Sequence, residues 1–391
     1  MNPRSMQGWL SVCVVLAAFG CSDEPLPSVH PGRADAATNA GDVQFEDSWL
    51  VDAALEVTAT DTATPTDSET EADKADTSDA GDVAPPEVAP LDVDDGRLGP
   101  PYPIVLAHGF FGTDKFGGLD FATYFYGVKD DLIQHGEPIV ETPGVEPFQN
   151  SAIRGAQLLA KIEALLAKTG HRKVVIIGHS QGGLDARWVA ATRPDLVEAV
   201  VTFATPHKGS AVADVAMGLV PWPGAKAVID ALVSLAGVNV WQSMSNKSSV
   251  SAAVAQLTTK AMEAFNATYP NQPGIAYYSL AGRSAYALAK KECAPDLAVD
   301  FVKKYDNNVD PLDIGFLATQ QVIDGGVFKA LPHDGLVRVE DARWGIFIGC
   351  VPADHLDEIG QLFGDLPGLI NPFNHKELYR SLVGWLRSRG H

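Results

Sequence analysis

Short, unbroken apolar runs alternate with segments of helical periodicity along residues 99–391. Such runs fit strands buried on both faces of a parallel sheet, and they occupy residues 104–107, 174–177 and 197–203. Residues 154–168 and 184–192 instead repeat apolar side chains every three or four positions, as helices with one buried face do. Gly170 and Pro194 follow these two segments and predict where the helices end. The pattern predicts an α/β domain over 99–391, with a mostly parallel central sheet flanked by helices.

The segment Gly178-His179-Ser180-Gln181-Gly182 joins an apolar run to a helical segment. A Gly-X-Ser-X-Gly sequence between a strand and a helix forms a tight turn that exposes the serine hydroxyl at a helix N-terminus. The flanking glycines leave room for that turn. Ser180 is therefore the predicted nucleophile of a serine hydrolase.

A serine nucleophile needs a histidine to take its proton and a carboxylate to orient that histidine. After this motif the acid precedes the histidine in the chain. Five histidines follow the motif: His207, His333, His355, His375 and His391. His355 follows a Gly-rich loop near the C-terminal end, and Asp334 lies in a loop before an apolar run, so these two complete the predicted triad. Asp354 is the alternative acid, but it is poorly placed to orient the ring next to it.

The other histidines fit the catalytic role less well. His207 comes too early to follow an acid, and His391 is the last residue of the sequence. His375 lies on the last helical segment. The ring of His333 is expected to point away from its neighbour Asp334, so we interpret His333 as structural.

Two backbone N–H groups are needed to stabilise the oxyanion of an acyl-transfer reaction. One is expected from Gln181, directly after the nucleophile. The other is expected from Phe110, in the loop His108-Gly109-Phe110 that follows the first apolar run.

Residues 211–255 combine Ala, Val and Leu with Pro221, Trp222, Pro223 and Trp241, and they hold few charges. They are either core helices or a lid that covers an apolar cleft and meets lipid when it opens. We favour a lid because these helices follow the nucleophile and have no adjacent strands to cover.

The formal net charge of −20 is unevenly distributed. Residues 22–98 carry −17, whereas residues 99–391 carry only −4, so the predicted folded domain is nearly balanced. No basic face suggests nucleic-acid binding. Residues 22–98 are rich in Asp, Ala, Thr, Pro and Glu and poor in aromatic side chains, which predicts a disordered, extended tether or linker.

An apolar run occupies about residues 9–19, too short to span a bilayer but suited to a signal peptide. The sequence LAAFGC resembles a bacterial lipobox, with Cys21 as the lipidated residue. We therefore expect a signal peptide over 1–20 and a tether over 21–98. The protein would be exported as an outer-membrane or cell-surface lipoprotein, or be released outside the cell after ordinary cleavage.

Four cysteines are present. Cys13 lies in the signal segment and Cys21 is the expected lipid anchor. Cys293 and Cys350 remain, and in an oxidising compartment a single disulfide between them is the expected arrangement, with two buried thiols as the alternative.

Six segments spread across residues 99–391 resemble, in the same order, the bacterial triacylglycerol lipases of the Pseudomonas and Burkholderia type. They are YPIVLAHG (102–109), GTDKF (112–116), IGHSQGG (177–183), TPHKGS (205–210), DGLV (334–337) and HLDE (355–358). The resemblance implies an α/β-hydrolase fold, a mobile helical lid and the triad Ser180, Asp334 and His355.

The same resemblance implies a structural Ca²⁺ near the catalytic histidine. Its ligands would be the carboxylates of Asp310 and Asp357 and the backbone carbonyls of Gln361 and Asp365, an oxygen-only set that suits Ca²⁺. A metal there would hold the loop of His355 still. Otherwise Asp357 would be a solvated loop acid. Some members of the family need a membrane-bound, lipase-specific foldase, so such a partner is a further expectation.

The leading hypothesis is hydrolysis of long-chain acylglycerols at a lipid–water interface. A carboxylesterase or phospholipase with the same triad is the enzymatic alternative. A catalytically silent, lipid-tethered adhesin is the non-enzymatic one.

Overall fold

The structure is a computed structural model, and it describes residues 96–112, 123–236, 249–284, 293–308, 310, 314–324, 331–361 and 371–391. Some predictions concern other parts of the chain. The signal segment 1–20, Cys21 and the acidic tether up to residue 95 lie outside the described residues. The same holds for Asp365 and for residues 237–248 of the expected lid.

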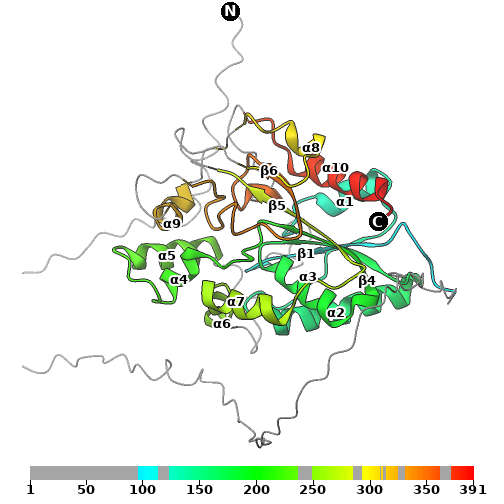
Figure 1. Cartoon of the computed structure of the whole chain (residues 1–391), viewed down its shortest axis with the longest axis horizontal. Coiled ribbons are helices and arrows are strands. Elements are labelled where there is room, and N and C mark those ends of the chain that lie inside the picture. The colour runs from blue at the N-terminus through cyan, green and yellow to red at the C-terminus, as the bar shows by residue number, and fades with distance from the viewer. Residues whose placement is uncertain are drawn as a thin grey trace, which may run out of the picture. The chain divides into compact units, whose positions relative to one another are not determined.

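Within the described residues, six parallel strands form one sheet in the order β2-β1-β3-β4-β5-β6 (Figure 1). The strands are β1 Ile104–Ala107, β2 Val140–Glu141, β3 Val174–His179, β4 Val197–Phe203, β5 Ala276–Gly282 and β6 Ile346–Val351. Every residue of β1 and β3 is buried, which explains why these strands are unbroken apolar runs in the sequence. The predicted α/β fold with a parallel sheet is confirmed.

The strand order reverses at β1, which pairs with β2 on one side and with β3 on the other. Ligands of open α/β sheets bind beyond the carboxyl ends of the strands at such a reversal. Ala107 at the end of β1 pairs with Gly178 near the end of β3. The loop after β1 and the turn after β3 therefore lie next to each other.

Helices cover both faces of the sheet (Figure 1). On one face, α2 (Ser151–Thr169) and α3 (Gln181–Thr192) pack on alternate strand residues such as Val105 and Ile176. On the other, α1 (Val128–Gln134), α8 (Asp300–Lys303) and α10 (His375–Ser388) pack on residues such as Leu106 and Ile177. The alternation follows from the two-residue period of a strand.

The helix ends follow local capping rules. The side chain of Asn150 accepts a hydrogen bond from the N–H of Ile153 at the start of α2, and Gly170 ends this helix with a positive φ of 76°. Asn374 caps α10 in the same way as Asn150 caps α2. Three 3-10 turns lie within the described part of the chain: Pro194–Leu196, Ile314–Phe316 and Asp357–Ile359.

The expected lid region contains three helices among its described residues: α4 (Ala211–Ala216), α5 (Ala225–Ala236) and α6 (Val250–Gln256). Helix α7 (Thr259–Thr268) follows them. Helices α4 and α5 pack on α9 (Leu317–Ile323) through a small apolar core of Val212, Val215, Val228, Val322 and Ile323. They therefore have a core of their own, apart from the two sheet faces.

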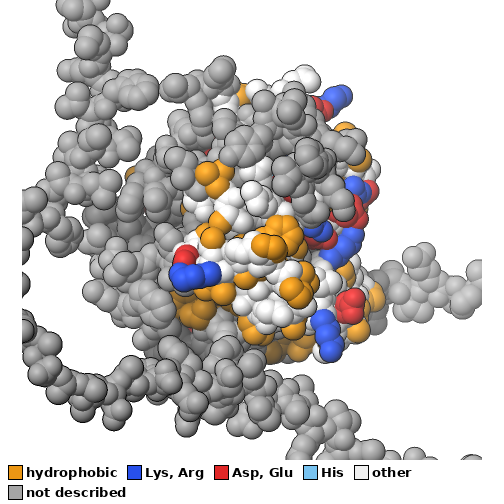
Figure 2. Space-filling view, turned by 90° about the vertical axis from the view of Figure 1, so that its left-hand side faces the viewer, with side chains coloured by type: hydrophobic (Ala, Val, Ile, Leu, Met, Phe, Trp, Pro, Cys, Tyr) orange, Lys and Arg blue, Asp and Glu red, His pale blue; other side chains and the backbone are white. Residues whose placement is uncertain are grey.

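The outer side of α4 and α5 is apolar. Leu219, Val220 and Ile229 are 58%, 45% and 41% exposed. Figure 2 looks onto the side of the molecule that carries α4 and α5 in Figure 1, and hydrophobic side chains gather there with few charged ones between them. Among the described residues, the helices are too short or too polar to cross a bilayer.

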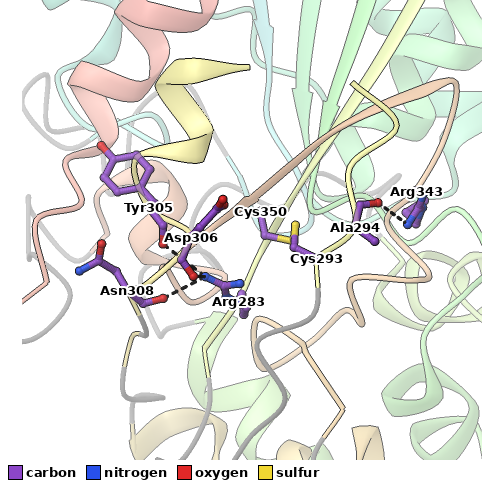
Figure 3. The surroundings of a disulfide bond; sticks show 8 residues. All are labelled: Arg283, Cys293, Ala294, Tyr305, Asp306, Asn308, Arg343 and Cys350. Carbon is purple, nitrogen blue, oxygen red and sulfur yellow. Dashed lines mark hydrogen bonds between the residues drawn. A yellow bond between two sulfur atoms is a disulfide. The ribbon is translucent and has the colours of Figure 1, made fainter. Parts of the chain in front are cut away.

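Cys293 and Cys350 form a disulfide, as the count of cysteines predicts (Figure 3). Their Cα atoms are 5.9 Å apart, and Cys350 lies on β6. The bond fastens the chain before α8 to the strand that leads toward His355. Nearby, the guanidinium of Arg283 donates to the carbonyls of Tyr305, Asp306 and Asn308, with distances of 3.4, 3.2 and 2.9 Å (Figure 3).

Candidate active site

Ser180 occupies the sharp turn between β3 and α3. Its φ of 54° and ψ of −130° are unusual for a residue with a side chain, so the backbone is strained there. The N–H of Ser180 donates to the carbonyl of Phe203 at 2.9 Å, which fixes the turn to the end of β4. A Cβ atom on Gly178 would lie 2.5 Å from the carbonyl oxygen of Gly182, so this turn requires glycine.

The side chain of His355 is within hydrogen-bonding distance of both Ser180 and Asp334. Ser180 Oγ lies 2.9 Å from Nε2 of His355, and Nδ1 of the same ring lies 2.8 Å from Oδ2 of Asp334. With the proton on Nδ1 donated to the carboxylate, Nε2 is free to accept the serine proton. The structure thus brings together all three residues of the predicted triad. Asp334 follows Ser180 by 154 residues in the sequence, and His355 follows Asp334 by 21.

Asp334 is itself held in place. Its Oδ1 accepts hydrogen bonds from the N–H groups of Leu336 and Val337 at 2.8 and 2.7 Å. The backbone N–H of His355 donates to the carbonyl of Asp334 at 2.9 Å, which ties the two loops together. Both side chains are buried. The carboxylate and the imidazole are therefore preorganised for proton transfer.

Both predicted oxyanion donors lie beside the nucleophile. Gln181 is the first residue of α3, so its N–H has no acceptor within the helix. A Cβ on Gly109 would lie 2.6 Å from Cβ of Ser180, so the loop that carries Phe110 packs directly against the nucleophile. Phe110 lines the same pocket as Ser180 and His355.

An apolar pocket opens onto Ser180 and His355. Its other walls come from the loop after β1, from the expected lid region and from the loop after Asp334. These walls include Phe111, Val212, Leu232, Val254, Leu257 and Leu336. The only charged or titratable side chains lining it, among the described residues, are His355 and Tyr124. Such a surface suits an aliphatic chain next to an ester carbonyl.

A second buried network, which the sequence analysis missed, lies behind the triad. Oε2 of Glu358 is 2.7 Å from Nε2 of His179, and Nδ1 of His179 is 2.8 Å from the hydroxyl of Tyr124. The ring of His179 lies 4.6 Å from that of His355, centroid to centroid. Burial raises the pKa of Glu358 well above its usual value, with Asp334 and other carboxylates adding to the effect. Burial lowers the pKa of His179 well below its usual value, with the neighbouring His355 adding to the effect, so both shifts favour the uncharged forms.

Comparison with known proteins identifies the family of the chain. Residues 146–294 match the family model described as alpha/beta hydrolase fold. A triacylglycerol lipase of Pseudarthrobacter phenanthrenivorans is 34% identical over 290 residues, which cover 67% of this chain and 90% of that lipase. A triacylglycerol lipase of Burkholderia plantarii is also 34% identical over 290 residues, covering 67% of this chain and 80% of that lipase.

The chain belongs to the triacylglycerol lipase family. It is an ester hydrolase with an α/β-hydrolase fold. The crystal structure of the mature Bacillus licheniformis lipase BlEst2 matches with a TM-score of 0.46 and 22% identity, covering 68% of this chain and 90% of that one.

Three carboxylates form a cluster, and none of them lines the pocket around Ser180. Oxygen atoms of Asp310, Asp354 and Asp357 lie within 4.8 Å of one another, and all three side chains are buried. Asp357 is therefore no solvated loop acid. Gln361 donates its side-chain amide to the carbonyls of Thr123 and Tyr124 at 2.5 and 2.9 Å.

Asp354, the alternative acid, has a different position in the enzyme. Its Oδ1 accepts hydrogen bonds from the N–H groups of Leu356 and Asp357 at 2.9 and 3.0 Å, and it belongs to the carboxylate cluster. Asp334 is the residue that contacts the ring of His355. From the sequence, Asp354 was only the alternative acid of the triad, and its place in this cluster was not predicted.

The remaining histidines have structural contacts, as their positions in the sequence suggest. His207 stacks on Trp344 with ring centroids 5.2 Å apart, and Nδ1 of His333 accepts from the N–H of Gly335 at 2.9 Å. His375 begins α10, with its Nε2 2.8 Å from the carbonyl of Tyr126. None of these three rings lines the pocket around Ser180.

Proposed function

We propose that the enzyme hydrolyses the ester bonds of acylglycerols through a covalent acyl-enzyme on Ser180. The observation that carries the proposal is the pair of hydrogen bonds that join Ser180 Oγ, His355 and Asp334. A serine hydroxyl is a weak nucleophile, and a histidine held by a carboxylate is the group that activates it.

In the first half of the reaction, Oγ of Ser180 attacks the ester carbonyl while its proton passes to Nε2 of His355. Asp334 stabilises the imidazolium that forms. The negative charge on the former carbonyl oxygen is taken up by the N–H groups of Phe110 and Gln181. His355 then gives the proton to the departing alcohol oxygen, and the acyl group stays on Ser180.

In the second half, water replaces the alcohol. His355 takes a proton from the water as it attacks the acyl carbonyl, and the same two N–H groups stabilise the second oxyanion. Collapse of this intermediate breaks the bond to Oγ, and His355 returns the proton to Ser180. A fatty acid leaves, and the enzyme is restored.

The apolar pocket supports a long acyl chain as the preferred substrate group. Four of its lining residues come from the region 211–255, which we propose acts as a lid over lipid substrate: Val212, Ala213, Leu232 and Val254. A carboxylesterase would prefer short, dissolved esters, and a phospholipase would need a site for the headgroup phosphate. Among the described residues that line the pocket, none is a lysine or an arginine, which disfavours the phospholipase.

The carboxylate cluster fits a calcium ion, because the three buried carboxylates have oxygens within 4.8 Å of one another and offer only hard oxygen donors. We propose that Asp310 and Asp357 hold it, joined by Asp354 and by the backbone carbonyls of Gln361 and Asp365. Bound Ca²⁺ would supply positive charge that offsets the carboxylates and fastens the loop of His355. Asp357 is only two residues from His355, so the position of the ring depends on this loop.

Export of the enzyme is a further part of the proposal. The apolar run before Cys21 and the disulfide between Cys293 and Cys350 both favour an oxidising compartment. We propose that Cys21 carries lipid and that residues 22–98 are the tether. A Cys21→Ser variant should then no longer incorporate labelled palmitate and should leave the membrane fraction. Incorporation that persists in this variant contradicts the anchor. Secretion of active enzyme with and without a co-expressed foldase tests the foldase partner.

The activity is tested with the Ser180→Ala variant. Hydrolysis of p-nitrophenyl butyrate and of emulsified triolein should both fall to the background rate. Ser279→Ala, which removes another buried hydroxyl on β5, is the matched control and should keep its activity. Full esterase activity in Ser180→Ala rejects the nucleophile. A wild-type enzyme active on butyrate but inactive on triolein would favour the carboxylesterase.

A further inference from the structure

Arg154 is completely buried, although it is a charged residue in the first turn of α2. Its guanidinium contacts three separate segments. Nε donates to Oδ2 of Asp185 on α3 at 2.8 Å. Nη1 donates to the carbonyl of Glu146 at 2.6 Å, in the segment that leads into α2. Nη2 donates to the carbonyls of His108 and Gly109 at 2.6 and 3.2 Å.

The contact with Gly109 bears on the oxyanion site. The carbonyl of Gly109 and the N–H of Phe110 belong to one peptide group, which is planar and trans. The oxygen and the hydrogen therefore point in opposite directions. A donor that holds the oxygen of Gly109 also fixes the direction of the N–H of Phe110.

His108 holds the same carbonyl from its own side chain. The N–H of Val145 donates to Nε2 of His108 at 3.1 Å, so Nε2 carries no proton. Nδ1 then bears the proton and donates it to the carbonyl of Gly109 at 3.0 Å. Burial, followed by the charge of Arg154, lowers the pKa of His108 to about 3, so the ring stays in this neutral form.

Asp185 links the same group to the nucleophile. It lies on α3, the helix that begins directly after Ser180, and it is buried against Arg154. Through Arg154, the helix that supplies the N–H of Gln181 and the loop that supplies the N–H of Phe110 are joined by one rigid, planar group. A guanidinium has the five fixed donors that such a junction needs, whereas a lysine ammonium does not.

We infer that Arg154 is a positioning residue for the oxyanion site, because it holds the Gly109–Phe110 peptide in register with α3. The ring of His108 and the backbone N–H of Gly112, 3.1 Å from the Gly109 oxygen, are further donors to the same carbonyl. The positive charge also polarises this peptide, because a hydrogen bond to its carbonyl strengthens the N–H at the other end as a donor. The inference rests on the proposed acyl-enzyme mechanism, and it adds a group that never touches the substrate.

The test compares Arg154→Met and Arg154→Lys with the wild type on p-nitrophenyl butyrate. A trifluoromethyl ketone, which forms a hemiketal oxyanion on the serine, provides the second measurement. A misplaced donor should lower kcat ~10- to 100-fold in Arg154→Met, with KM changed less than about threefold. The inhibition constant of the ketone should rise by a similar factor. Arg154→Lys keeps the charge but not the fork, and its losses in both measurements should be smaller.

Arg187→Met is the matched control. Arg187 is also buried on α3, but its guanidinium donates to Asn266 and to the carbonyl of Tyr269, away from the oxyanion loop. Its loss should destabilise the fold while kcat and the ketone affinity stay close to wild type at temperatures where the variant is folded.

An Arg154→Met enzyme with the kcat of the Arg187→Met control, or with unchanged ketone affinity, overturns the inference. If Arg154→Met does not fold, the decision passes to Arg154→Lys, and wild-type values of kcat and ketone affinity in that variant also overturn it. A wild-type enzyme that the ketone does not inhibit would refute the acyl-enzyme mechanism itself. The two failures are therefore distinguishable.

Discussion

Helix α3 packs against the loop after β1 so closely that residue 182 has no room for a side chain. A Cβ on Gly182 would lie 2.1 Å from the carbonyl oxygen of Ala107 and 2.6 Å from that of His108. Both atoms are backbone, so no side chain can turn away. Ordinary contact begins near 3.4 Å, and Gly182→Ala therefore has to separate α3 from this loop by about 1 Å.

That separation affects both stability and catalysis. Overpacking of this size costs ~1–3 kcal/mol of unfolding free energy. It also moves the loop of Phe110 away from Ser180, and a displacement of about 1 Å at the reacting centre can lower kcat ~100-fold. We expect both losses in Gly182→Ala, with the loss of kcat still present at temperatures where the variant is fully folded.

Gly384→Ala is the matched control, because a Cβ at this position in α10 meets nothing within 4 Å. Alanine is the better helix former, so this variant should gain ~0.5–1 kcal/mol and keep its kcat. Urea unfolding and steady-state kinetics on p-nitrophenyl butyrate give the two quantities. A Gly182→Ala enzyme within about 0.5 kcal/mol and twofold of the wild type would refute the close approach of α3 and the loop.

Three further predictions concern pH, the disulfide and calcium. The pKa of His108 is lowered from 6.5 to about 3, so between these values the unfolded chain binds a proton that the folded enzyme does not. The contribution of His108 to the unfolding free energy is present above pH 6.5 and is lost as the pH falls toward 3, by about 1.4 kcal/mol per pH unit. In His108→Gln the midpoint of urea unfolding should therefore depend less on pH in that window. An unchanged pH profile of this midpoint would contradict the buried neutral ring. Replacing both Cys293 and Cys350 with serine should cost about 4 kcal/mol, given their separation of 57 residues, and an unchanged urea midpoint would contradict this. Chelation with EDTA should lower the thermal midpoint of the wild type but not that of Asp357→Asn, with the exposed Asp306→Asn as control; a wild type indifferent to EDTA rejects the metal.

The triad was predictable because its chemistry imposes an order on the sequence. The Gly-X-Ser-X-Gly turn identifies Ser180, and acid followed by histidine then selects Asp334 and His355 from several candidates. The buried strands β1, β3 and β4 were also predictable, because short, unbroken apolar runs such as IVLA and VVII are typical of strands buried on both faces of a parallel sheet. The strands β2, β5 and β6 were not singled out. Strand β2 has only two residues, and β5 mixes tyrosine and serine with its apolar residues.

The supporting residues were not predictable in this way. Arg154 looks like a solvated position on an amphipathic helix, and only the packing of α2 on α3 shows that it is buried. Glu358 and Tyr124 are 234 residues apart, yet both bond to His179. Asp354 was weighed as a partner of the adjacent histidine, whereas its carboxylate lies with Asp310 and Asp357. These contacts depend on long-range packing, for which a single sequence has no local signal.

The central claim is that Ser180 is a nucleophile activated by His355, and mass spectrometry of the enzyme treated with a fluorophosphonate tests it most directly. We expect one adduct, on the peptide that contains Ser180. Its rate of formation should fall at least ~1000-fold in His355→Gln, because the hydroxyl then has no base. A wild-type enzyme that stays unlabelled, or labelling of Ser180 at an equal rate in His355→Gln, would contradict the account.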